Sequence, residues 1–563
     1  MRRSVCKRLI PLLLSLLLTL SLLPAAAADS GYRDVPEGSW AAESIEKATA
    51  YGLMNGMGDG IFGYGSDIRR GEFITLLVRL FRWEMPEADG ALFTDVSAGD
   101  WFAPYLTAAV DHGVMDRGGA FRPAEAITRE DMAVFFVRAL GYGDLAETAA
   151  RFSLPFTDIS AHAGYITVAY DLGLVNGMTA TTFVPSATAT REQAAAMLVR
   201  VYERYYHDTD FLHGFYAISS YSQLHLASGM DAVSAGWSRM TLDENNVPFL
   251  RTTSADGNEF YVPTGYSEVV ETLAQQDVPL HLSVYMDTSV SAVVDSEETN
   301  TLYALLADPQ RRTAAVEAIL SEVTTPYRAI GYNPYAGVTI DFEGLRGEAV
   351  KANFTAFLTE LSAALDDAGK TLYVTVQPAL YTGAYYDGFD YRAIGRLADK
   401  VILMAHDYAP TSLDGFEGTT YYRNAALTPL DQVYYSLRAA TDRETGVEDA
   451  GKLVLAISCA SMAWQLDDSG LLASPTPLRP SQDTVYRRMQ QPDAVKGWSE
   501  TYRNPYLTYT TEAGEHIFLW YEDSRSVAEK VTLAKLFGIS GVSLWRLGII
   551  PDYEGYSILD AIS

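Results

Sequence analysis

The sequence predicts an α/β protein in which three mainly helical repeats precede a closed parallel (β/α)8 (TIM) barrel. The first two hundred residues repeat one pattern at intervals of about 60 residues. After residue 205, eight short apolar strands alternate with helical segments over about 350 residues, which fits a barrel. A doubly wound open sheet is the alternative, but no glycine-rich phosphate loop follows the first predicted strand. The barrel is therefore favoured.

The first residues are typical of a secretory signal. Basic residues from Arg2 to Arg8 precede an apolar run over 9–23, and the alanines that end at Ala28 form a small-residue cleavage site. The apolar run is shorter than the roughly 20 residues that a membrane span requires. We therefore expect residues 1–28 to be removed and the protein to be exported without a transmembrane anchor.

Charge and cysteine content exclude several classes of function. The net charge of −29 argues against nucleic acid as a partner, because phosphates require a basic surface. Cys6 would leave with the signal, so Cys459 would have no intrachain partner and is expected in the core. No histidine and cysteine cluster has the spacing of a metal site. We expect neither a metal nor a cofactor.

The repeats define three predicted domains, 29–88, 89–148 and 149–207. They open with related segments that contain Asp34, Asp95 and Asp158. Each unit ends in a second helix with apolar residues at i, i+3, i+4, i+7 and i+8, which is the stripe of a helix that packs on a core.

An arginine follows the cap position of each second helix: Arg70, Arg129 and Arg191. Arginine in a first turn opposes the helix dipole, so helix propensity alone does not explain it. A guanidinium beside free helix N–H groups can hold an anion. The alternative is an ion pair between each arginine and an acid of a neighbouring repeat, and the sequence leaves both open.

The three units resemble S-layer homology repeats over residues 32 to about 205. The resemblance implies non-covalent anchoring to an acidic secondary polysaccharide of a Gram-positive-type cell wall or S-layer. Five residues would bind it: Arg70, Arg129, Arg191, Trp40 and Trp101. The third copy places Gly164 and Tyr165 where the others carry tryptophan, which predicts a weaker third pocket.

The barrel is expected to occupy residues 208–563. Its strands are predicted at 211–219, 232–238, 280–285, 337–343, 372–377, 401–407, 453–458 and 541–547, and two of its helices at 350–368 and 524–537.

The fourth predicted strand carries two acids on one side. In Gly337-Val-Thr-Ile-Asp-Phe-Glu343 the side chains of Asp341 and Glu343 share one face, because side chains alternate along a strand. Carboxylates are rarely buried unless they are paired or functional. A solvated strand end with an ion pair is the structural alternative.

This segment resembles the fourth-strand motif of glycoside hydrolase family 18, in the branch of spore-cortex and cell-wall N-acetylglucosaminidases. Met404-Ala-His406-Asp407 and the segment 541–548 around Trp545 resemble the sixth- and eighth-strand motifs. The resemblance implies that Glu343 is the general acid, that Asp341 and Asp407 hold the substrate acetamide, and that Trp545 stacks on a sugar.

Three positions depart from the family pattern. Thr339 stands where an aspartate is usual, Ala336 where a further acid is usual, and His406 where a tyrosine supports the intermediate. A histidine can still donate a hydrogen bond, but its protonation would follow pH. We retain His406 as a catalytic candidate.

Further polar and aromatic residues end the predicted strands, where barrel active sites lie. They suit a sugar-binding cleft and comprise Tyr216, Trp237, Tyr285 and Gln377. The negative charge of Asp341 would raise the pKa of Glu343 and keep it protonated for general acid catalysis.

The predicted function is hydrolysis of β-1,4 N-acetylglucosaminyl bonds by a substrate-assisted retaining mechanism, in peptidoglycan first and chitin-like oligomers second. Two alternatives remain open: a catalytically weak or inactive carbohydrate-binding barrel tethered to the wall, and an S-layer scaffold whose barrel has no sugar affinity.

Overall fold

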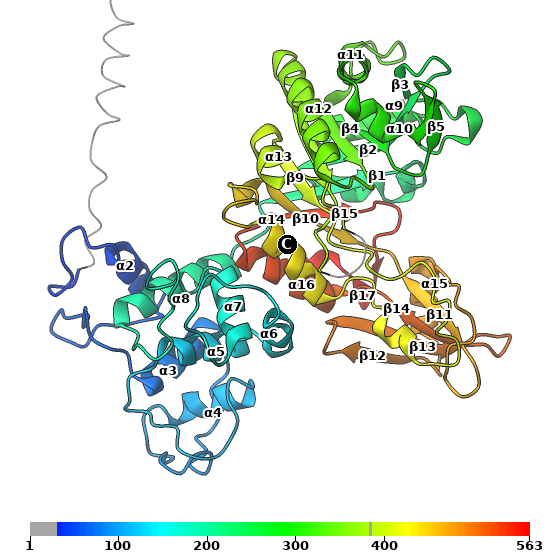
Figure 1. The fold of residues 1–563 in the computed structure, drawn as a ribbon. Helices are drawn as coiled ribbons and strands as arrows, with labels where there is room; N and C mark the ends of the chain where they lie inside the picture. Colours follow the sequence, from blue (N-terminus) through cyan, green and yellow to red (C-terminus); the bar gives the residue numbers. More distant parts are fainter. Residues whose placement is uncertain (1–30, 382–384, 563) are drawn as a thin grey trace, which may run out of the picture. The chain divides into compact units, whose positions relative to one another are not determined.

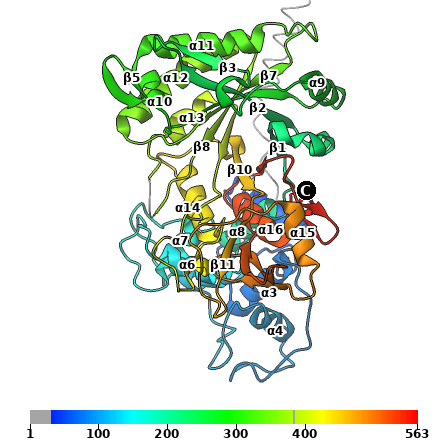
Figure 2. The same ribbon diagram turned by 90° about the vertical axis from the view of Figure 1, so that its right-hand side faces the viewer.

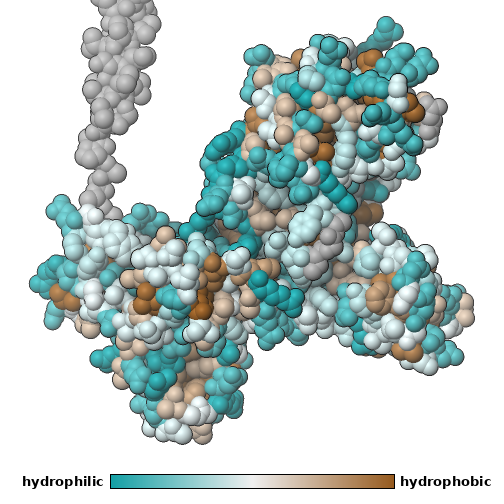
Figure 3. Space-filling model, in the orientation of Figure 1, coloured by the Kyte–Doolittle hydropathy of each residue, from teal (hydrophilic) through white to brown (hydrophobic). Residues whose placement is uncertain are grey.

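The structure is a computed structural model that describes residues 31–381 and 385–562. The predicted signal, including Cys6, lies outside the described residues. The chain divides into two compact units, Met1–Glu203 and Arg204–Ser563. Over the described ranges, no helix is both long and apolar enough to cross a bilayer. The faces of the two units shown in Figure 3 are mostly hydrophilic with small hydrophobic areas.

The N-terminal unit is helical, as predicted (Figure 1). Each repeat supplies a first helix and a second helix, and α6 follows the second helix of the middle repeat. The bounds are α2 Ala42–Ala50, α3 Arg70–Leu80, α4 Ala103–Asp111, α5 Arg129–Ala139, α6 Gly143–Ala149, α7 Ala163–Asp171 and α8 Arg191–Tyr205.

The three repeats close on one another in a ring. The backbone N–H of Arg70 donates to Glu125 in the second repeat, and that of Arg129 donates to Ala187 in the third. The N–H of Arg191 then donates to Ser66 of the first repeat at 2.9 Å. Each second helix therefore begins against the next repeat, and the third returns to the first.

The second unit contains the predicted barrel. Eight parallel strands pair in the order β1-β15-β10-β9-β8-β7-β4-β2, and β2 pairs with β1 to close the ring. Figure 2 labels β1, β2, β7, β8 and β10. The bounds are β1 Phe211–Tyr216, β2 Ala232–Leu242, β4 Leu280–Met286, β7 Tyr335–Phe342, β8 Thr371–Val376, β9 Lys400–Leu403, β10 Leu453–Ser458 and β15 Gly541–Trp545. The short strand β3 Pro248–Arg251 pairs with β2 in the antiparallel direction.

Helices connect the barrel strands, and the two helices named from sequence are found at α12 Glu348–Asp367 and α16 Ser524–Leu536. The remaining connecting helices are α9 Tyr266–Gln275, α10 Thr301–Ala307, α11 Pro309–Thr324, α13 Tyr391–Leu397 and α14 Leu430–Ala440. A small antiparallel pair, β5 Ser291–Val294 and β6 Glu297–Asn300, precedes α10.

The sixth predicted strand is too long in the sequence-based assignment. Strand β9 ends at Leu403, so His406 and Asp407 lie in the loop that follows it. Asp407 has a positive φ of 56°, which a strand does not allow. The loop conformation, set by tertiary contacts, overrides the apolar pattern here.

A four-stranded antiparallel sheet, not predicted from sequence, is inserted between β10 and α16. Its order is β11-β14-β13-β12, and it lies beside α15 Gln482–Met489 in Figure 1. Its bounds are β11 Met462–Leu466, β12 Val495–Ser499, β13 Asn504–Thr510 and β14 His516–Trp520. The buried carboxylate of Glu522 joins it to α16, because it accepts from Asn504 at 2.7 Å and from Lys530 at 2.8 Å.

Candidate active site

Two acids stand at the carboxyl end of β7. Asp341 is only 4% exposed and its Oδ1 accepts a hydrogen bond from Thr375 Oγ1 of β8 at 2.7 Å. Glu343 comes just after the strand, where its N–H donates to the carbonyl of Met286 at 2.9 Å. The predicted pair is therefore held between the ends of three neighbouring strands.

Burial makes both acids hard to ionise. The pKa of Asp341 is raised by burial, and the hydrogen bond from Thr375 and the charge of His406 partly oppose this rise. The pKa of Glu343 is raised further, first by burial and then by the charges of Asp341 and Asp287. This arrangement favours a protonated Glu343 carboxyl beside an ionised Asp341 near neutral pH.

The chain next to Glu343 is fixed by Gly344 and Gln377. Gly344 has a φ of +82°, and a Cβ there would lie 2.1 Å from Thr288 Oγ1, so only glycine fits. Its N–H donates to Gln377 Oε1 at 2.5 Å. Gln377 therefore holds the backbone that carries Glu343, and its predicted contact with substrate stays a prediction.

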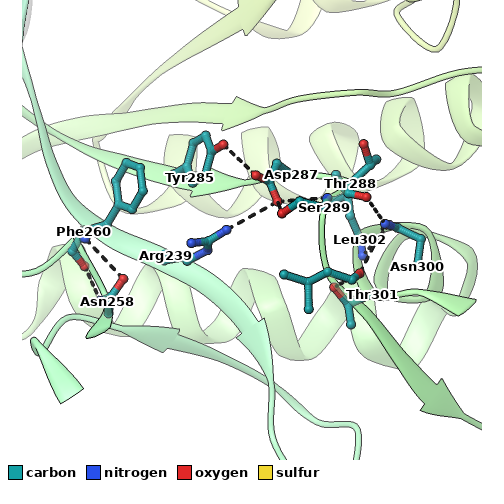
Figure 4. A network of polar contacts seen from close by, with 11 residues as sticks. Arg239, Asn258, Phe260, Tyr285, Asp287, Thr288, Ser289, Asn300, Thr301 and Leu302 are labelled. Atoms are coloured by element: carbon teal, nitrogen blue, oxygen red, sulfur yellow. Dashed lines mark hydrogen bonds and ion pairs between the residues drawn. The ribbon is translucent and has the colours of Figure 1, made fainter. Parts of the chain in front are cut away.

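A third acid, Asp287, was missed from sequence. It follows β4, and its carboxylate receives hydrogen bonds from Tyr285 Oη at 2.8 Å, Ser289 Oγ at 2.6 Å and Arg239 Nη2 at 3.3 Å (Figure 4). These partners hold the pKa of Asp287 below its usual value, although its burial opposes them. Its position two residues after Tyr285, at a strand end, was the signal that could have found it.

The hydroxyl of Tyr285 is committed to Asp287, and its ring stacks on Phe260 with centroids 4.3 Å apart. Burial and the charge of Glu343 keep the pKa of Tyr285 far above its usual value, so the phenol stays protonated. Tyr285 thus supports Asp287 in addition to any contact with a sugar.

His406 and Asp407 form a pair in the loop after β9. His406 Nδ1 lies 3.0 Å from Asp407 Oδ2. Burial raises the pKa of Asp407, but the charge and hydrogen bond of His406 outweigh this effect, and the net pKa is lowered. Asp407 is thus an ionised acceptor, as holding an acetamide N–H would require.

A cavity of about 560 Å³ opens beside Asp341, within the range of small-molecule sites. Asp341 lies in its wall, together with the predicted residues Tyr216 and Trp545. Trp237 is 0% exposed and packs against Tyr216. It therefore cannot offer a face for sugar stacking, and its predicted role as a contact residue is corrected to support of Tyr216.

Thr339 belongs to a buried polar chain inside the barrel. Its hydroxyl lies 2.6 Å from Ser234 Oγ, which lies 2.7 Å from His213 Nε2, and His213 Nδ1 lies 2.7 Å from Ser543 Oγ. Burial lowers the pKa of His213 to about 3, with a smaller effect from His281. The position where family members carry an aspartate is therefore occupied by an uncharged network.

The three repeat arginines are buried and each reaches into the next repeat. Arg70 donates to the carbonyl of Phe121, Arg129 to that of Phe183 and Arg191 to that of Phe62, at 2.9 to 3.0 Å. Their acid partners differ. Arg70 pairs with Asp131, and Arg191 Nη1 lies 3.8 Å from Glu72.

Arg129 forms no ion pair within the described residues. Burial lowers its pKa, which the charge of Asp158 only partly opposes. The position equivalent to Glu72 and Asp131, two residues after the helix arginine, is Gln193 in the third repeat. The ion-pair alternative thus holds for Arg70, weakly for Arg191, and not for Arg129.

The aromatic residues of the repeats lie on the surface of their unit. Trp40 is 64% exposed and Trp101 is 63% exposed, and Trp101 lines a groove of about 370 Å³ with Arg191, Arg79 and Glu72. The first residues of the helices show which residue of the third repeat corresponds to the tryptophans. Trp40 and Trp101 lie two residues before α2 and α4, and Ala161 lies two residues before α7. Gly164 and Tyr165 lie one turn further on.

The fold and site together define a (β/α)8 barrel with an acid pair at the end of β7, preceded by three helical repeats. Residues 286–549 match the family model of glycosyl hydrolases family 18, and residues 31–74, 92–133 and 155–195 match that of the S-layer homology domain. The chain carries three S-layer homology repeats followed by a domain of glycosyl hydrolase family 18.

Individual proteins are similar to parts of this chain. The chain is 27% identical over 238 residues to a cortical fragment-lytic enzyme of Bacillus subtilis (strain 168), which covers 41% of this chain and 50% of that protein. It is 27% identical over 179 residues to an S-layer protein of Bacillus thuringiensis subsp. finitimus, or 31% of this chain and 22% of that one. A chitinase structure from Chromobacterium violaceum ATCC 12472 aligns at 19% identity and TM-score 0.48, over 62% of this chain and 97% of the other. The chain thus spans half or less of the length of these two sequence relatives.

Proposed function

We propose that this protein is a wall-anchored glycosidase that cleaves β-1,4 N-acetylglucosaminyl bonds, in peptidoglycan first and in chitin-like oligomers second. The observation that carries the proposal is Glu343: a carboxyl two residues after the cavity residue Asp341, whose pKa is raised by burial and by three neighbouring acids. A protonated carboxyl is what the departure of a glycosidic oxygen requires.

The mechanism needs only one proton donor. Glu343 gives its proton to the glycosidic oxygen as the bond to the anomeric carbon breaks, and the carbonyl oxygen of the sugar's own acetamide bonds to that carbon. Water then attacks the same carbon as the Glu343 carboxylate takes a proton from that water. The bond between the anomeric carbon and the acetamide oxygen breaks, which restores the acetamide. Two inversions leave the configuration retained.

Asp341 and Asp407 would hold the acetamide during both steps. Asp341 keeps one carboxylate oxygen on Thr375 and has the other available to accept the acetamide N–H. Asp407 is ionised and partly exposed, with 38% of its side chain accessible. His406, bonded to Asp407, would stand in for the tyrosine of other family members.

The repeats would tether the enzyme to an acidic wall polysaccharide of a Gram-positive-type cell, which places the protein at the cell surface. Support comes from the buried arginines and from the match to the S-layer homology domain. Arg129, a buried cation without an ion pair in the described part of the chain, is the best-placed anion ligand.

A sugar-binding barrel without turnover is the second candidate, and the uncharged network around Thr339 favours it. Incubation of the protein with purified sacculi separates the two. The proposal expects released muropeptide fragments with N-acetylglucosamine reducing ends, detected by mass spectrometry, and proton NMR should show the β-anomer first. Binding of sacculi without any released fragment would favour the second candidate.

A further inference from the structure

Two charged side chains that line the cleft, Arg546 and Glu259, have no role in the mechanism above, and Arg546 is the cation. Arg546 follows Trp545 at the end of β15 and lines the same cavity as Asp341. It is half-buried, and Nη1 donates to Ser219 Oγ, another cavity residue, at 2.9 Å. The guanidinium therefore lies at the wall of the cleft, where it donates a hydrogen bond to a neutral hydroxyl.

Arg546 has no counter-ion among the residues that the structure describes. Its hydrogen-bond partners are serine hydroxyls and the carbonyl of Leu547, and burial lowers its pKa. The pKa of Glu343 is raised by burial and by three carboxylates, and Arg546 is not among the charges that act on it. Arg546 therefore does not serve to neutralise the acid pair. In a chain of net charge −29, a half-buried cation without an acid partner is unusual.

The chemistry that fits this cation is an oxyanion with two oxygens. A guanidinium offers parallel N–H donors in a fixed fork that matches a carboxylate, and such charged pairs are the strong hydrogen bonds. Chitin-like oligomers carry no such group. A muramyl sugar carries a lactyl carboxylate, which is free where no stem peptide is attached.

We propose that Arg546 binds the lactyl carboxylate of a muramyl sugar next to the cleaved bond, and so selects peptide-free peptidoglycan strands over neutral glycans. This inference rests on the proposed function of the cleft as a glycan site. It also implies that an amidase-type reaction, which removes stem peptides and frees the carboxylate, supplies the preferred substrate.

The test uses the full chain and three glycans of matched length: peptide-free strands, the same strands with the carboxyl reduced to an alcohol, and a chitooligosaccharide. For wild type, kcat/KM should be about 10-fold or more higher on the carboxylate strands than on the reduced ones. R546Q should bring this ratio close to one, and R546K, which keeps the charge but not the fork, should leave an intermediate ratio. R487Q removes an exposed arginine paired with Asp483 and should keep the wild-type ratio.

Several outcomes would overturn the assignment. An unchanged ratio in R546Q, or an equal loss on all three glycans, would show that Arg546 supports the fold of the cleft and does not read the carboxylate. Strands that still carry stem peptides form a fourth arm. If the dependence on Arg546 appears only there, the recognised carboxylate belongs to the peptide.

Failure of the enzyme proposal would be distinguishable. If wild type cleaves none of the glycans, calorimetry can instead compare the affinities of wild type and R546Q for the same set. A preference for carboxylate strands that is lost in R546Q would uphold the inference for a non-catalytic barrel. Equal binding of charged and reduced strands by wild type would reject it.

Discussion

At the scale of single residues, the reactivity of the site depends on how firmly Glu343 holds its proton. General acid catalysis is present while the carboxyl is protonated, so activity should be lost as pH rises through the raised pKa of Glu343. Asp341 must be ionised to hold the acetamide, so activity should also be lost as pH falls through its own raised pKa. The acid and alkaline limbs of the pH profile therefore belong to Asp341 and Glu343 as a pair.

Asp287 provides a way to move the alkaline limb. D287N removes one of the negative charges that raise the pKa of Glu343, so the limb of kcat/KM should move to lower pH. S289A is the matched control, because it removes a hydrogen bond to Asp287 and leaves the charge in place. Identical alkaline limbs in wild type and D287N would show that Asp287 does not act on Glu343.

His406 can be tested by restoring the residue typical of the family. If its imidazole acts as a hydrogen-bond donor, the tyrosine hydroxyl of H406Y can replace it, and the rate should be kept or raised. The measurement is kcat/KM on a soluble glycan. An H406Y variant that still binds the glycan but is inactive would show that His406 has another role.

At the scale of elements, the alternation along 337–343 was sufficient to predict the acid pair, because a parallel strand buried on both faces has few reasons to carry two carboxylates. All eight barrel strands were predicted, and β10 was predicted with its observed bounds. The inserted sheet β11–β14 was missed, because its short strands depend on pairing with one another. Arg546 was missed for a related reason: only the fold shows which charges line the cleft. Asp287 was missed although its place at a strand end was a usable signal.

The repeats differ in the ion pairing of the arginine that begins each second helix, which the sequence alone did not show. Because Arg70 and Arg191 form ion pairs and Arg129 forms none among the described residues, R129A should weaken retention on sacculi more than R70A or R191A, by about 10-fold or more. The measurement is the fraction of protein that sediments with purified sacculi over a range of salt. Unchanged retention when all three arginines are replaced together would rule out the anion sites.

At the scale of the whole molecule, anchoring and chemistry should separate. The chain divides at Glu203 and Arg204, and each side has its own core. Deletion of residues 29–203 should abolish retention on sacculi and leave the turnover of soluble glycans in place. Retention of the truncated protein at the wild-type level would assign wall binding to the barrel, and loss of turnover would show that the units depend on each other.

The central claim is that Glu343 is the proton donor in hydrolysis of an N-acetylglucosaminyl bond, and E343Q tests it most directly. Glutamine keeps the size and hydrogen bonding of the side chain but removes the acidic proton. Release of fragments from sacculi, quantified by mass spectrometry, should therefore fall by about 100-fold or more, while binding of the glycan persists. If wild type and E343Q bind sacculi and chitooligosaccharides equally and neither releases fragments, the barrel is a lectin and the claim is contradicted.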